Sequence, residues 1–137
     1  MTSMNGLGLS AVVALAGCMT ELDERVSTAN GAQLYAENCA VCHGSGRGGT
    51  ATEETRTATQ APDLTLLSQR NGGVYPEIHV LATIYGPAFE RAHGRLMPEF
   101  GERDLGPTVV VELEDGIGSP VPADLIALSA YLRSIQR

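Results

Sequence analysis

Residues 39–43 of this 137-residue chain read Cys-Ala-Val-Cys-His, and this string constrains the structure more than any other part of the sequence. The preceding residues, 31–38, are good helix formers. On a helix, side chains three and four positions apart lie on one face. We therefore expect one helix over 31–43, with Cys39, Cys42 and His43 projecting from the same face.

Two thiols and an imidazole at this spacing suit the covalent attachment of haem. Each thiol can add to one of the two vinyl groups on one side of the macrocycle, and the adjacent imidazole then reaches the iron. A redox dithiol would need a βαβ context, whereas these flanks are helical and Gly-rich. A structural zinc site would need a fourth ligand, and the only other cysteine is Cys18. The motif predicts one haem c bound through Cys39 and Cys42, with His43 on the iron.

The first twenty residues carry no charge and contain an apolar run of signal-peptide length. The run ends in Leu-Ala-Gly-Cys18, which resembles a bacterial lipobox, where the cysteine is lipidated and becomes the first mature residue. We expect a lipoprotein signal peptide over 1–17, a polar lipid-anchored tether over 18–30, and a domain over 31–137. This places the protein on the periplasmic side of a bacterial membrane. An uncleaved N-terminal helix anchor, a buried Cys18, and a soluble periplasmic protein are the alternatives.

Composition limits the classes of binding partner and shows that few large side chains are available to fill a core. The net charge is −7 and all nine basic residues are Arg, which excludes nucleic acid as a partner because its backbone attracts positive surfaces. Only six residues are aromatic and none is Trp. A haem would supply the large flat group that this sequence lacks. With two cysteines on haem and Cys18 on lipid, no cysteine remains for a disulfide.

Four motifs in order make the chain resemble the class I cytochromes c over about 31–137. They are a Gly, an aliphatic–aromatic pair and the haem motif at the N-terminal helix; a Pro and Leu loop; a Met followed by Pro; and an aliphatic–Tyr-Leu pattern in the last helix. In this sequence these are Gly31, Leu34-Tyr35 and Cys39–His43; Ala61-Pro62-Asp63-Leu64; Arg95-Leu96-Met97-Pro98-Glu99-Phe100; and Leu128-Ser129-Ala130-Tyr131-Leu132-Arg133.

The resemblance implies an all-α fold around one haem, with Met97 as the sixth iron ligand. It also implies that the Pro62 carbonyl accepts a hydrogen bond from His43, that Leu64 lies on the same side of the haem, and that the first and last helices cross at Gly31 and Tyr131. Pro98 favours an extended backbone at Met97, so the thioether would project from a loop. From the residues alone, His79 or His93 could replace Met97 as the ligand.

The rest of the sequence predicts short helices and one β-insertion. The first helix has a capping region at Thr28 and Asn30. Further helices are expected over 62–69, 76–85 and about 123–136, and a small β-hairpin is expected near 108–117 because β-branched residues precede Asp-Gly. In the helix over 76–85, Ile78, Leu81 and Ile84 would cover one haem edge. The Gly- and Thr-rich stretch 44–61 is expected to be a surface loop.

A haem iron that is held by both His43 and Met97 has no open coordination position. The expected function is therefore one-electron transfer rather than catalysis on a substrate. The resemblance implies redox partner proteins, and the lipobox implies that these are membrane-associated. Two alternatives remain open at this point. The chain could be the haem subunit of a larger oxidoreductase, or a gas or redox sensor that releases Met97.

Overall fold

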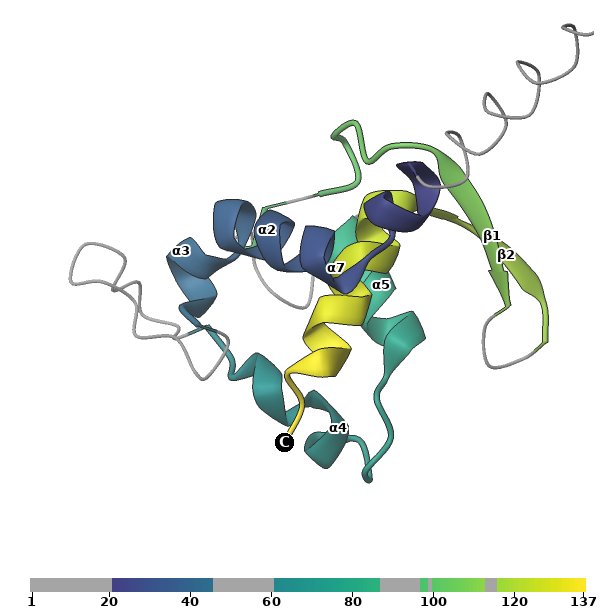
Figure 1. Ribbon diagram of the computed structural model, residues 1–137. Helices are drawn as coiled ribbons and strands as arrows, with labels where there is room; N and C mark the ends of the chain where they lie inside the picture. The colour runs from purple at the N-terminus through teal and green to yellow at the C-terminus, as the bar shows by residue number, and fades with distance from the viewer. Residues whose placement is uncertain (1–20, 46–60, 87–96, 99, 113–115) are drawn as a thin grey trace, which may run out of the picture.

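The computed structural model describes residues 21–45, 61–86, 97–98, 100–112 and 116–137. The C-terminal helix α7 lies at the centre, with the other helices around it and a two-stranded ribbon projecting from one side (Figure 1). The chain is mostly helical with one small hairpin, which confirms the predicted class. The elements are α2 (Thr28–Asn38), α3 (Ala40–His43), the 3-10 helix η2 (Leu64–Leu66), α4 (Leu67–Arg70), α5 (Glu77–Tyr85), β1 (Thr108–Glu112), β2 (Gly118–Pro122) and α7 (Ala123–Ser134).

The first long helix begins and ends at other residues than the sequence predicted. Its N-cap is Ser27, one residue before the expected capping region, and the Ser27 hydroxyl accepts from the Asn30 N–H at 3.1 Å. Its C-cap is Cys39, so the expected single helix over 31–43 is divided. The N–H groups of Cys42 and His43 both donate to the Cys39 carbonyl and begin the separate short helix α3.

Helices α2 and α7 form the largest packing interface between the described elements. Gly31 lies where they cross, because a methyl group at this position would fall 1.9 Å from the Ala127 carbonyl oxygen. One turn further along α2, Tyr35 contacts Tyr131, with ring centroids 5.1 Å apart. The predicted crossing at Gly31 and Tyr131 is present, and it requires the absence of a side chain at Gly31.

The hydrophobic core lies between α2, α5 and α7. Three leucines of α7, at 125, 128 and 132, are buried in it. Helix α5 begins one residue after the expected Pro76 and contributes Leu81 and Ile84 to the core. Val80 is also buried there, whereas Ile78 is 41% exposed, and the cover of a haem edge by Ile78, Leu81 and Ile84 stays a prediction. The buried face of α5 therefore follows positions 80, 81 and 84.

The predicted insertion near 108–117 is an antiparallel hairpin that extends to Pro122. Thr108 pairs with Pro122 and Glu112 with Gly118. Alternate residues of β1 are exposed, and Val110 in the middle of the strand is 71% exposed. The hairpin contributes Val121 to the core and leads directly into α7. It thus joins the loop after Met97 to the last helix.

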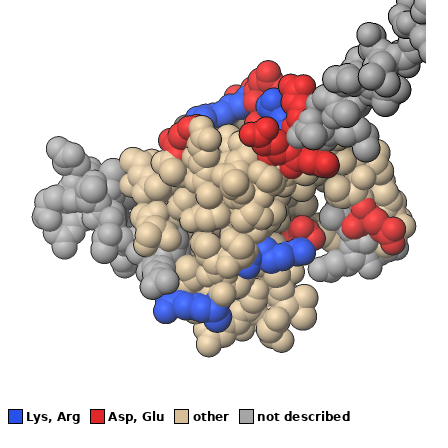
Figure 2. Space-filling view, viewed as in Figure 1, with Lys and Arg blue, Asp and Glu red and all other residues tan. Residues whose placement is uncertain are grey.

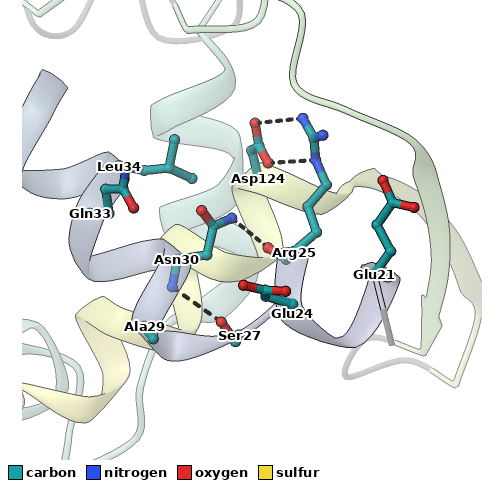
Figure 3. A pocket seen from close by; sticks show the side chains of 9 residues that line it. All are labelled: Glu21, Glu24, Arg25, Ser27, Ala29, Asn30, Gln33, Leu34 and Asp124. Atoms are coloured by element: carbon teal, nitrogen blue, oxygen red, sulfur yellow. Dashed lines mark hydrogen bonds and ion pairs between the residues drawn. The ribbon is translucent and has the colours of Figure 1, made fainter. Parts of the chain in front are cut away.

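The segment before α2 is folded, although we expected 18–30 to be a tether. Residues 21–25 are helical. Figure 3 shows the Arg25 guanidinium beside the buried Asp124 carboxylate at the start of α7, with distances of 3.0 and 3.3 Å. The Asn30 side chain donates to the Arg25 carbonyl at 2.6 Å. The folded domain therefore includes residues 21–30. No described helix is long and apolar enough to cross a membrane.

We predict that Gly31→Ala lowers the free energy of unfolding by about 2–3 kcal/mol, because the new methyl group overpacks the α2–α7 crossing. A denaturant titration of the purified protein measures the change. Ala36→Gly, at an exposed position of the same helix, is the control and should cost about 1 kcal/mol through helix propensity alone. An unfolding free energy that rises in Gly31→Ala would contradict the close approach.

Candidate functional site

The two cysteines and the histidine of the motif lie at the junction of α2 and α3. Cys39 is the residue between the helices, and Cys42 and His43 lie on α3. All three side chains are half-buried, and both thiols are free. The Cys42 and His43 N–H groups both donate to the Cys39 carbonyl. The three residues therefore stay within one helical turn, although α2 ends at Asn38.

His43 is oriented by a residue nineteen positions away in the sequence. Its Nδ1 lies 3.3 Å from the Pro62 carbonyl oxygen. A carbonyl can only accept, so Nδ1 carries the proton in this contact and Nε2 is left with a lone pair. Burial lowers the pKa of His43, with the Pro62 hydrogen bond acting in the opposite direction. A neutral imidazole with a free Nε2 is the form that binds a metal ion.

The thiol of Cys39 is kept protonated by its surroundings. Burial raises its pKa to about 11, while the positive charge of Arg103 acts against this shift. Arg103 also donates to the Asn38 side chain at 2.6 Å and lies over the Phe100 ring at 4.7 Å. Arg103 thus ties the end of α2 to the segment after Met97. The sequence gives no signal for this role of Arg103, since no local pattern links positions 38 and 103.

Met97 lies half-buried against the hydrophobic core. The residues that follow it are fixed on the end of α5. Phe100 is buried, and the N–H groups of Phe100 and Gly101 donate to the Ile84 and Tyr85 carbonyls at 3.3 and 2.8 Å. This attachment holds the Met97 segment against the hydrophobic core, and Cys39 and Leu64 also pack against this core.

The other predicted site residues divide into two groups. Leu64 is half-buried against the core and Pro62 is exposed, its carbonyl bonded to His43. His79 is exposed on α5. Cys18, His93 and most of the 44–61 loop lie outside the described residues. In the described part of the chain, no group of three or more Cys, His, Asp and Glu side chains is arranged to hold a metal ion.

The residues present fit a haem. The donor set is two free thiols and one imidazole with a free Nε2, which is what thioether formation and iron ligation need. Beside Cys39, the hydroxyl of the buried Tyr35 has no hydrogen-bond partner among the described residues. Burial raises the pKa of Tyr35 to about 12, so this hydroxyl stays a donor. An unpaired buried donor next to Cys39 suits a site that a polar or macrocyclic group completes.

The comparison with known families decides the identity. The family model for cytochrome c matches residues 28–136. The chain belongs to the cytochrome c family. Searches of curated proteins and of solved structures gave no match. Members of the family bind haem c, usually through the thiols of a Cys-x-x-Cys pair, and Cys39 and Cys42 have that spacing in this cytochrome.

The described surface of the cytochrome is acidic. Figure 2 shows acidic side chains gathered beside the start of the described chain. The acidic residues without a described ion pair are all exposed: Glu21, Asp23, Glu24, Glu37, Glu102, Asp104 and Glu112. The described arginines all have partners within the chain, namely Arg25, Arg70, Arg103, Arg133 and Arg137. The described surface therefore offers no unpaired basic patch.

We predict an acid-dependent loss of stability that depends on Asp63, next to Pro62. Thr65 donates two hydrogen bonds to the Asp63 carboxylate, and these, together with Arg137, hold its pKa below the usual range. A carboxylate with a lowered folded pKa stabilises the protein above its unfolded pKa of about 3.9, and this contribution disappears as the pH falls through the folded value.

The test compares denaturant midpoints of the wild type and Asp63→Asn between pH 7 and pH 2. The wild type should have the higher midpoint at pH 7, and the difference should shrink below about pH 4 as Asp63 takes up its proton. Glu102→Gln, which changes an exposed carboxylate outside this cluster, is the control. A difference that stays constant through this range would contradict the assignment.

Proposed function

We propose that this cytochrome is a one-electron carrier whose single haem c is attached through Cys39 and Cys42 and ligated by His43 and Met97. The observation that carries the proposal is the contact between His43 Nδ1 and the Pro62 carbonyl oxygen. His43 lies on the same helical turn as both cysteines. When bound, the haem supplies an iron that alternates between the ferric and ferrous states. Family membership supports electron transfer in general, and it favours a carrier over an enzyme.

The residues of this chain keep the ligands in place during electron transfer. The Pro62 carbonyl fixes the His43 ring and raises its basicity as a ligand. The Phe100 and Gly101 hydrogen bonds to the end of α5 hold the segment that carries Met97. A thioether ligand favours the reduced state relative to a second histidine and so raises the reduction potential. Rigid ligand segments keep structural reorganisation small when the charge changes.

A tether at Cys18 would place the carrier beside the membrane. The proposal is supported by the Leu-Ala-Gly-Cys18 string and by the folded segment that includes residue 21. The three peptide units between Cys18 and residue 21 reach at most about 10 Å. A lipid on Cys18 would therefore keep the domain close to the periplasmic membrane surface. Membrane-associated redox proteins are the partners that such a position favours, because confinement raises their effective concentration.

We predict that Met97→Ala abolishes the low-spin spectrum with the weak ferric iron–Met charge-transfer band and allows the ferrous protein to bind CO. The reason is that loss of the thioether opens one coordination position. The visible spectra of both oxidation states, with and without CO, provide the measurement. His93→Ala is the control and should leave the wild-type spectrum unchanged.

An intact charge-transfer band in Met97→Ala would show that another residue is the sixth ligand. Loss of the wild-type spectrum in His93→Ala instead would identify that histidine. CO binding by the wild type would favour the sensor function. Stable co-purification with a catalytic protein would favour the oxidoreductase subunit.

We predict that Cys18→Ser releases the cytochrome from the membrane fraction without changing its haem spectrum, since the lipid anchor on Cys18 would be lost while the haem motif is retained. Fractionation and intact-mass measurement of the wild type and variant test this. Met19→Ala, which alters the next residue but keeps the cysteine, is the control. A wild-type mass without lipid would contradict the anchor while leaving the haem proposal unaffected.

A further inference from the structure

Gln136 and Arg137 form hydrogen bonds with the segment that follows Pro62. The Gln136 side chain accepts from the Ser68 N–H at 2.9 Å and donates to the Leu64 carbonyl at 2.8 Å. It also donates to the Leu132 carbonyl of α7 at 2.7 Å. Gln136 thus connects the backbone of the 64–68 segment to the central helix.

Arg137 makes a second connection, closer to Pro62. Its Nη2 donates to the Asp63 carboxylate at 3.0 Å and its Nε to the Thr65 hydroxyl at 2.8 Å. Its backbone N–H donates to the Thr65 carbonyl at 3.1 Å. Thr65 is 2% exposed and in turn donates to Asp63. Asp63, which follows Pro62 directly, is therefore held by hydrogen bonds from both Thr65 and Arg137.

The hydrogen bond that this segment supplies to His43 is long. At 3.3 Å, it lies beyond the common range of about 2.7–3.2 Å for an N–H donor to oxygen. A displacement of Pro62 by about 0.3 Å away from His43 would therefore break it, because a contact of about 3.6 Å is no longer a hydrogen bond. Pro62 is itself exposed and has no N–H group, so its position depends on the residues that flank it.

We propose that Gln136 and Arg137 are positioning residues for the axial histidine, holding the Pro62 carbonyl against His43 through the 63–68 segment and so setting the reduction potential. The inference rests on the proposed haem ligation by His43. A stronger hydrogen bond at Nδ1 makes the imidazole a more basic ligand and favours the ferric state. Loosening the segment should raise the reduction potential, since the ferric state loses this support.

Arg133 offers a matched control for Arg137. Both are half-exposed arginines at the end of the chain, and each forms an ion pair, Arg133 with Glu77 at 2.6 Å and Arg137 with Asp63 at 3.0 Å. Arg133→Gln and Arg137→Gln remove the same charge, but only the latter loosens the Pro62 segment. Loss of a positive charge by itself favours the ferric state and lowers the potential. The positioning effect therefore has the opposite sign to the charge effect.

The experiment measures the reduction potential and the hydrogen exchange of the His43 Nδ1–H in the ferrous holoprotein. We expect a higher potential in Arg137→Gln than in Arg133→Gln, and exchange faster by about fivefold, the factor for losing one ordinary hydrogen bond. Arg137→Lys, which keeps the charge but loses the fork geometry, should raise the potential above wild type.

Gln136→Met provides a second variant in case Arg137→Gln does not fold, since it removes the hydrogen bonds and retains the side-chain volume. It should also raise the potential and speed Nδ1–H exchange. Equal potentials and equal exchange rates in the variants and in Arg133→Gln would overturn the positioning role. Covalent haem by mass and an intact Met charge-transfer band in each variant keep that outcome distinct from failure of the haem proposal, in which the wild type itself would lack these signatures.

Discussion

The structure depends on the close crossing of α2 and α7 at Gly31, where the helix backbones meet without an intervening side chain. The cysteine and histidine motif follows α2 directly, with Cys39 as its C-cap and Cys42 and His43 on α3. The segment after α7 carries the residues that hold Pro62. Both sides of the His43 environment therefore extend from one helix pair. A change in the crossing would alter the position of His43 relative to its hydrogen-bond acceptor.

Much of the fold was predictable because its signals are local. The helix formers, the glycine and proline boundaries and the β-branched run gave the helices over 76–85 and 123–136 and the hairpin to within a few residues. The break at Cys39 was not predictable, since no Gly or Pro marks it. The fold of 21–30 was missed for another reason: it depends on Arg25 meeting Asp124, ninety-nine positions away, and a charged segment looks the same whether it is solvated or paired.

The site followed the same division. Cys39, Cys42 and His43 lie within five consecutive residues, so their spacing alone predicts a shared haem site, and this assignment stays a prediction. Pro62 could be named only through the resemblance to a family, and the contact with His43 is present in the structure. The roles of Arg103 and of the last two residues depend on contacts between distant segments, which single-sequence patterns do not encode.

The hairpin has a consequence for how the cytochrome behaves at high protein concentration. A two-stranded ribbon with an exposed apolar residue such as Val110 offers edges on which strands of other molecules can assemble. In β2, however, Pro120 and Pro122 have no N–H to donate to an incoming strand. The missing N–H groups of these two prolines therefore disfavour aggregation through the β2 edge, and this effect does not depend on the charge of the neighbouring protein.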